Sequence, residues 1–340
     1  MSVYRPWGNV RWLLNKLQTL DWVTLGCIAT ESRSCASVVN YSDFSSNFVM
    51  LKITDPQPLK TDKVEQAYKA SENYLKTIPN DQKTIIDSEL MATLDDLEDY
   101  VELCLTKGPN VILDITSFPK RWFFPFIQMM INDDRVENLV TVYTQGENYA
   151  ANIAENPELL RPLPGFITAD ERSSHDHAFV GVGFHDLGML KLLGDDRVKS
   201  LDLLFPFPPG PPGTKKNWKF VEQINRKIGS EISNEDLSEP LSLHFLPALD
   251  ASEAFTAMSN ITRQGQRSSI MAPYGPKPIS LAMCLFAIAT DNANLKDVPV
   301  YYSQPQRYAI DYTKNALSSD KEIQSWAYAL KLGGRSLYTI

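Results

Sequence analysis

The segment NVILDITSFPKRWFFPFI (residues 110–127) decides the fold class of this chain. It passes from a short β-rich strand pattern, through a turn with the dipeptide Pro119-Lys120, into an apolar helical pattern. Strands that alternate with helices in this way are typical of crossover units and a largely parallel sheet. Strand candidates recur along the chain at residues 22–29, 47–53, 110–115, 138–144, 178–184, 200–207, 241–247, 268–273 and 298–303. The sequence therefore predicts an α/β fold with mostly parallel sheets.

Helical periodicity fills the intervals between these strands. We expect helices over residues 60–78, 88–108, 217–229, 250–263 and 277–290. The C-terminal segment SWAYALKLGGRSLYTI (325–340) has alternating runs on both sides of Gly333-Gly334, which predicts a β-hairpin. The proline-rich segment FPFPPGPPGTKKNWK (205–219) is expected to form a stiff surface loop.

The composition limits the classes of function. A chain of 340 residues is long enough for two domains or one large α/β domain. The formal net charge of −8 argues against binding of duplex nucleic acid, because neutralising phosphates requires a basic surface. The four cysteines form no CxxC pair and the N-terminus has no signal-peptide pattern, which predicts a cytoplasmic protein. The most apolar run (279–289) is too short to span a bilayer, so we expect no membrane association.

The sequence also carries an internal echo. Three pairs of landmarks occur in the same order at nearly constant separation. They are VYTQGENYA (142–150) with YYSQPQRYA (301–309), whose Tyr143 and Tyr302 are 159 residues apart, and Gly26 with Gly183 and Pro119-Lys120 with Pro276-Lys277, both 157 residues apart. The echo predicts two tandem, related Rossmann-like units at 1–155 and 178–340, joined by a connecting segment at 156–177. Alternatively, unrelated parallel α/β units resemble one another wherever strands end in Gly or Pro.

Ligands of open parallel sheets lie beyond the carboxyl ends of the strands, so the strand-to-helix turns are the candidate sites. In the turn PYGPKP (273–278), Gly275 permits a tight backbone turn and Lys277 begins a helix whose free N–H groups favour an anion. A phosphate or carboxylate is expected to bind there. The alternative is a solvated lysine beside a structural turn.

The corresponding turn of the first half, DITSFPKR (114–121), gathers a carboxylate, two hydroxyls and two cations. These are Asp114, Thr116, Ser117, Lys120 and Arg121. They suit a polar ligand, or else the hydroxyls cap the following helix and the cations lie on the surface.

Two further groups of side chains complete the candidate ligand-binding set. Glu31 and Arg33 follow the first strand of this half and are expected either to contact hydroxyls or bases of a ligand, or to pair with each other or with neighbouring loops. The last-strand turns of the two halves place polar and aromatic side chains at equivalent rims, namely Gln145, Tyr149, Gln304 and Tyr308.

Motifs of known catalytic chemistry are absent, since the sequence lacks HExxH, GxSxG and GxxxxGK[ST]. The tripeptide His175-Asp176-His177 is expected to be part of a polar connecting loop rather than a metal site. The basic segment around Trp218 could grip a nucleotide, but a solvated loop is the better interpretation. We expect no metal and no cofactor.

The turns DITSFPKR and PYGPKP resemble those of the CRISPR-associated Rossmann-fold (CARF) domains and the related SAVED domains. In these families a strand ends in a Thr/Gly/Lys-type turn and runs into an apolar helix. Here YGPKP stands where such domains often have a Gly-Thr-Lys turn. The resemblance implies a pocket for cyclic oligonucleotides, two units facing each other across a two-fold or pseudo-two-fold axis, and a role in prokaryotic antiviral defence.

Three functional hypotheses follow. The first is a nucleotide or anionic small-ligand binding protein that acts as a sensor or partner subunit, with an effector protein or a second copy of itself as partner. The second is an enzyme that acts on a nucleotide or phosphorylated small molecule, with Asp114 or Glu31 as acid/base and Lys277 or Arg121 holding charge. The third is a scaffold subunit of a defence complex.

Overall fold

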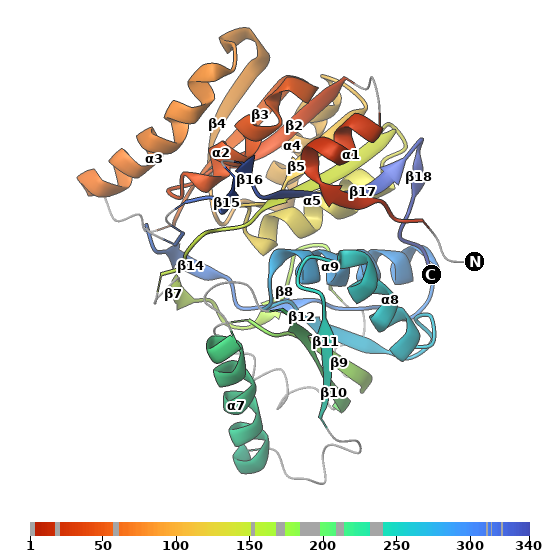
Figure 1. Ribbon diagram of the computed structural model, residues 1–340. Coiled ribbons are helices and arrows are strands. Elements are labelled where there is room, and N and C mark those ends of the chain that lie inside the picture. Colours follow the sequence, from red (N-terminus) through yellow and green to blue (C-terminus); the bar gives the residue numbers. More distant parts are fainter. Residues whose placement is uncertain are drawn as a thin grey trace. The chain divides into compact units, whose positions relative to one another are not determined.

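The structure is a computed structural model of the chain. It describes residues 4–17, 21–56, 61–150, 154–167, 174–183, 198–208, 214–231, 241–310, 312–313, 315–320 and 322–340. The chain forms two compact units (Figure 1). Unit 1 comprises Met1–Asn156 and Pro305–Leu337, and unit 2 comprises Pro157–Gln304 and Tyr338–Ile340.

Unit 1 is an α/β unit with short 3-10 helices at Ser42–Phe44, Leu75–Thr77 and Asn80–Gln82. Its elements are β1 Trp7–Asn9, α1 Val10–Lys16, β2 Trp22–Ile28, α2 Arg33–Asn40, β3 Ser45–Thr54, α3 Asp62–Tyr74, β4 Lys83–Glu89, α4 Leu94–Leu105, β5 Asn110–Asp114, α5 Lys120–Asn132, β6 Asn138–Thr144, β7 Ala154–Pro157, β14 Pro305–Tyr308, β15 Ser318–Ser319, β16 Glu322–Ile323, β17 Ser325–Leu332 and β18 Arg335–Ser336.

The main sheet of unit 1 has the strand order β1-β17-β6-β5-β2-β3-β4, with β18 paired to β17. Strands β2 to β6 are parallel, whereas β17 is antiparallel to both β6 and β1. The chain adds β3 and β4 on one side of β2 and then returns to place β5 and β6 on its other side. The loops after β2 and β5 therefore flank the point where strand order reverses.

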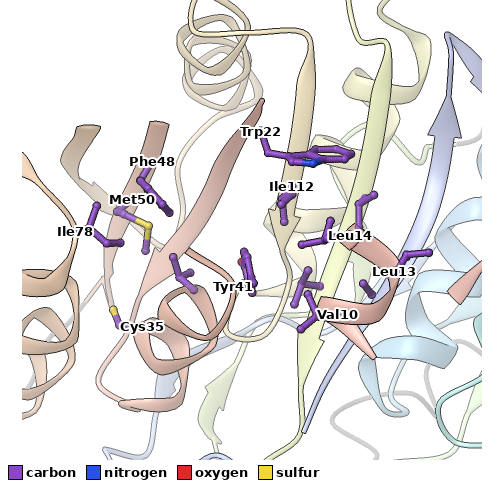
Figure 2. Close-up of a cluster of buried hydrophobic side chains, with 14 of the residues drawn as sticks. Val10, Leu13, Leu14, Trp22, Cys35, Tyr41, Phe48, Met50, Ile78 and Ile112 are labelled. Carbon is purple, nitrogen blue, oxygen red and sulfur yellow. The ribbon is translucent and has the colours of Figure 1, made fainter. Parts of the chain in front are cut away.

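Apolar side chains of α1 and α2 form a hydrophobic core with one face of this sheet (Figure 2). The cluster includes Val10 and Leu14 from α1, Tyr41 after α2, and Trp22 and Ile112 from the strands. Every residue of β2 is buried, as expected for a parallel strand covered on both faces. Helices α4 and α5 contribute no residue to this cluster.

Unit 2 contains a second, four-stranded sheet. Its elements are β8 Arg161–Pro162, β9 His175–Gly181, β10 Val198–Pro206, α7 Thr214–Glu231, β11 Ser242–Leu246, α8 Ala251–Ile261, β12 Ser269–Ala272, α9 Lys277–Asn292 and β13 Tyr301–Tyr302. The sheet is parallel, with the order β11-β10-β9-β12, and Val300 forms a parallel bridge to Met271 of β12. When the strands of each sheet are numbered along the chain, β11-β10-β9-β12 has the same order as β4-β3-β2-β5 in unit 1, and the bridge at Val300 corresponds to β6. Strand order reverses between β9 and β12.

The C-terminal segment belongs to unit 1. Strands β17 and β18 pair antiparallel across Gly333 and Gly334, whose φ angles of 53° and 73° are left-handed and favour glycine. Because β17 pairs with β6, residues 305–337 cluster with unit 1, whereas the sequence analysis placed them with 178–340.

Two local predictions are wrong. The tripeptide His175–His177 opens strand β9 instead of lying in a connecting loop, because His175 and His177 alternate along the strand and are buried. The predicted proline-rich loop at 205–219 ends early, since α7 begins at Thr214, after the last proline; residues 209–213 lie outside the described residues. None of the described helices is long and apolar enough to cross a membrane.

Candidate functional site

The point where strand order reverses in unit 1, which we call its switch point, is occupied by a buried ion pair. Arg33 is the first residue of α2, and its Nη2 lies 3.3 and 3.1 Å from the two carboxylate oxygens of Glu31. Its Nη1 donates to the Thr144 carbonyl at 3.0 Å. The residues are only 2% (Arg33) and 8% (Glu31) exposed. Burial is the largest influence on the pKa of Arg33 and lowers it, but the Glu31 carboxylate together with Tyr149, Tyr143 and Tyr312 outweighs burial, so the net shift is upward and the guanidinium is charged.

The Glu31 carboxylate also accepts hydrogen bonds from two hydroxyls on other segments. Ser117, in the loop after β5, donates at 2.5 Å, and Thr313 donates at 2.7 Å. Thr313 belongs to a segment that we call the C-terminal cover (residues 312, 313 and 315–317). This cover pairs with the loop after β6 through the bridges Tyr149↔Thr313 and Gly146↔Ala316.

Asp114 ends β5 and lies in a buried hydrogen-bond network that adjoins the ion pair, since Arg33 donates to the carbonyls of both Thr144 and Thr116. Its carboxylate accepts hydrogen bonds from Ser37 Oγ (2.6 Å), Tyr41 OH (2.8 Å) and the Thr116 amide (2.9 Å). Burial raises the pKa of Asp114, and these hydrogen bonds offset only part of the rise. At 2% exposure the carboxylate faces α2 and not the loop edge. Thr116 connects this network to the end of β6, because its Oγ1 accepts a hydrogen bond from the Thr144 amide.

The two predicted cations of this turn lie at the start of α5. Lys120 is its first residue, and burial lowers the pKa of its ammonium group to about 8. Arg121 donates to the Ala92 carbonyl at 3.4 Å. The helix is preceded by Pro119, has no side-chain cap and carries no acidic residue in its first turn. The first turn of α5 therefore concentrates positive charge.

The predicted rim residues are distributed over both units. Gln145 accepts a hydrogen bond from Trp326 Nε1 at 3.2 Å. Tyr149 and Tyr308 both contact Tyr312, with ring centroids 5.9 and 6.0 Å apart, so these two residues of the echo meet within unit 1. Gln304 is buried in unit 2, where its carbonyl accepts from the Glu158 amide. The structure thus does not give the tyrosines equivalent places in two units.

In unit 2 the loops that flank the switch point approach each other closely. A Cβ atom added at Gly183 would lie 2.0 Å from the Tyr274 carbonyl oxygen, and one added at Gly275 would lie 3.2 Å from the Val182 carbonyl oxygen. Glycine at these positions therefore allows the loops after β9 and β12 to touch. Lys277 is the first residue of α9, which, like α5, follows a proline, has no side-chain cap and has no acidic residue in its first turn.

Unit 2 also contains a polar cluster that the sequence analysis missed. Asp202 on β10 lies between two histidines of neighbouring strands, 2.8 Å from both His177 Nδ1 and His244 Nε2. Ser200 donates to the same carboxylate, and Arg267 lies 3.4 Å from His177 Nε2. The available signal was Asp202 itself, the only charged residue in the apolar run SLDLLF. Among the described residues, no group of three His, Cys, Asp or Glu is arranged to hold a metal ion.

We expect Asp202 to make stability fall in acid. Burial alone raises the pKa of this carboxyl, but the bonds to His177 and His244 outweigh it and lower the pKa from 3.8 to about 2. A carboxyl with a depressed pKa stabilises the fold above its unfolded pKa and loses that contribution as pH falls toward its folded pKa. Between about pH 5 and 2, the stability advantage of the wild type over Asp202→Asn should shrink by about 2 kcal/mol.

Urea unfolding of both proteins across this pH range measures the effect. His244→Gln, which alters one of the two partners, should show an intermediate change. An advantage that stays constant with pH would contradict the assignment.

Comparison with known proteins adds no established function. No protein-family model and no curated protein matches the chain. Among solved structures it is similar to a type III CRISPR defence DNA nuclease activated by cyclic oligoadenylate, with 9% identity, a TM-score of 0.48, and 83% of this chain and 65% of that chain covered. The chain thus spans just under two thirds of that nuclease.

Two other solved structures are similar over most of their length. One is a short-chain dehydrogenase/reductase (glucose/ribitol dehydrogenase) from Brucella melitensis, with 9% identity, a TM-score of 0.25, and 82% of this chain and 93% of that chain covered. The other is the cytoplasmic domain of a prokaryotic cation chloride cotransporter, with 9% identity, a TM-score of 0.22, and 86% and 98% covered. All three TM-scores are below 0.5, so we draw no functional conclusion from them.

Proposed function

We propose that this protein binds a nucleotide or another anionic small ligand and acts as a sensor or partner subunit. The observation that carries the proposal is the matching start of α5 and α9. Each helix begins with a lysine after a proline, Pro119-Lys120 in one unit and Pro276-Lys277 in the other, and each follows the strand that lies next to its switch point. An anion suits both positions.

The local charges support an anionic ligand. A helix start is commonly satisfied by a capping side chain or an acidic residue in the first turn, and α5 and α9 have neither. In both helices the ammonium group adds to the positive end of the helix dipole. For Lys120, burial already lowers the pKa, so an anion beside it would stabilise the charged form.

We also infer that the two units arose by duplication. The common strand order and the common place of α5 and α9 within it support this inference, as does the separation of 157 residues between Lys120 and Lys277. We propose that the duplicated segments are residues 1–155 and 178–340, and that residues 305–337 of the second segment belong to unit 1 in the folded protein. A role in antiviral defence is part of the proposal only through the resemblance of the turns to CARF domains.

We do not extend the proposal to catalysis. Asp114 faces Ser37 and Tyr41 inside unit 1, and the Glu31 carboxylate is engaged by Arg33, Ser117 and Thr313. Neither geometry favours an acid/base role over a structural one.

Thermal unfolding with a panel of nucleotides and cyclic oligonucleotides tests the proposal. A ligand at about 100 times its Kd should stabilise the native protein by about 2.7 kcal/mol and raise the melting midpoint by several degrees. Lys120→Gln should weaken a ligand that binds at unit 1, and Lys277→Gln a ligand that binds at unit 2, about 10- to 100-fold, because each change removes a charge-assisted hydrogen bond.

Lys63→Gln is the matched control. Lys63 is exposed and also lies in the first turn of a helix, but α3 carries the acidic residues Asp62 and Glu65 there. This variant should bind like the wild type. The proposal is wrong if no member of the panel shifts the midpoint of the folded protein. The assignment of the site is wrong if a ligand binds both lysine variants as tightly as it binds the wild type.

A further inference from the structure

The Glu31 carboxylate occupies a position where donors from three separate segments converge. Arg33 Nη2 approaches both of its oxygens from the start of α2, Ser117 Oγ donates from the loop after β5, and Thr313 Oγ1 donates from the C-terminal cover. These segments meet at the switch point of unit 1, where α/β sheets bind their ligands. The Glu31 carboxylate therefore lies where the anionic group of a bound ligand is expected.

The donor set suits a phosphate at least as well as a carboxylate. Arg33 Nη2 donates to both oxygens of Glu31 and can donate in the same way to two oxygens of a phosphate, and the Ser117 hydroxyl can donate to a further oxygen. Arg33 also has unused capacity, because its buried Nε has no hydrogen-bond partner. Its guanidinium lies 5.9 Å from the centre of the Tyr149 ring, on the same loop edge.

The C-terminal cover closes this position. A Cβ atom at Gly146 would lie 2.7 Å from Thr313 Cγ2, so the cover packs directly on the loop after β6. It is fixed there by backbone hydrogen bonds, including Leu317 to the Gln145 carbonyl and Ala150 to the Tyr312 carbonyl. An anion can reach Arg33 only if Glu31 leaves and Thr313 gives way.

We propose that Arg33 and Ser117 form a phosphate site that the chain's own Glu31 carboxylate occupies under the C-terminal cover, and that a phosphate group of the ligand displaces both Glu31 and Thr313 of the cover from it. The inference rests on the proposed function, because it assigns to unit 1 one phosphate of that anionic ligand. Glu31 then acts as an internal competitor. Ligand binding is then coupled to movement of the C-terminal cover, a segment that follows the main part of unit 2 (Pro157–Gln304) in the sequence.

Removing the competitor tests the inference. Glu31→Ala should bind inorganic phosphate about 10- to 100-fold more tightly than the wild type in calorimetric titration, if the open state is populated at about 1–10%. Adding Arg33→Gln to this variant should abolish the gain. Glu102→Ala is the control, since Glu102 forms an exposed ion pair with Arg135 and should leave phosphate affinity unchanged.

A second variant and a second measurement keep the test decisive if Glu31→Ala does not fold. Glu31→Gln preserves the side-chain volume and should also bind phosphate more tightly than the wild type, by a smaller factor than Glu31→Ala. In the wild type, saturating phosphate should speed hydrogen exchange at the amides of Ala150 and Leu317, whose hydrogen bonds join the cover to the loop after β6. Unchanged phosphate affinity in a folded Glu31 variant overturns the inference, as does unchanged exchange where neither variant folds. Inorganic phosphate needs no nucleotide, so this failure is distinct from a negative nucleotide panel.

Discussion

Arg33→Met is expected to lower the free energy of unfolding by about 3–5 kcal/mol, because it leaves a buried carboxylate without its cation. Both partners of the Arg33–Glu31 pair are almost completely removed from solvent. Ser117 and Thr313 still donate to Glu31, but two hydroxyls do not replace a guanidinium that contacts both carboxylate oxygens. The variant also leaves the Thr144 carbonyl without the bond that it accepts from Arg33.

A double-mutant cycle separates the pair from its surroundings. Arg33→Met combined with Glu31→Gln should recover about half of the loss, since neither charge is then buried alone. Arg135→Met is the control: Arg135 pairs with Glu102 and Asp133 at 57% exposure, so it should cost no more than about 1 kcal/mol. Urea unfolding measures Arg33→Met, Glu31→Gln alone, the double variant and Arg135→Met. Equal costs for Arg33→Met and Arg135→Met would show that burial of the pair has no energetic consequence.

The mostly parallel α/β character was predictable because it depends on local patterns. Residues 22–28, 110–114 and 138–144 form strands close to the predicted bounds, and all of their residues are buried. A continuous apolar run between helical patterns is what a strand covered on both faces requires. Helix α5 begins at Lys120, directly after the proline that marked its start in the sequence.

The place of the C-terminal segment was not predictable from local patterns. Strand β17 lies between β1 and β6, partners that are far away in the sequence, and this long-range pairing helps to assign residues 305–337 to unit 1. The similarity of the sequences around Tyr149 and Tyr308 suggested equivalent places in two units, and it did not indicate that both residues lie in unit 1. Strand β4 was missed since its polar residues, KTIIDSE, give a weak strand pattern.

For the candidate site, the sequence supplied the members within each turn but not the contacts between turns. Glu31 and Arg33 are two residues apart, and the structure contains both their mutual ion pair and their contacts with neighbouring loops, which were considered from the sequence as alternatives to ligand binding. Thr313 contacts Glu31 across 282 residues, and Ser37 and Tyr41 contact Asp114 across 77 and 73. Such contacts depend on tertiary packing and leave no spacing that could be recognised.

Asp114→Ala is expected to lower the free energy of unfolding by about 3–5 kcal/mol. The change leaves the buried Tyr41 hydroxyl and Thr116 amide without their acceptor, at about 1–3 kcal/mol for each unsatisfied group, and it opens a small cavity. Ser37 keeps a partner, because its hydroxyl also lies 2.7 Å from Thr144 Oγ1. Asp114→Asn should cost less, since an amide preserves the volume and one acceptor.

The pH dependence of Asp114→Asn identifies the role of the carboxyl group. Burial raises the pKa of Asp114 above its ordinary value of 3.8, so the contribution of this group is fully present below 3.8 and is lost as pH rises through the folded pKa. The stability advantage of the wild type over Asp114→Asn should therefore shrink from pH 3.8 toward neutral pH. This sign is opposite to that expected for Asp202, whose pKa is lowered. An advantage that grows with pH would instead indicate a carboxylate that the fold stabilises in its charged form, as expected of a group placed to face a cation or a ligand.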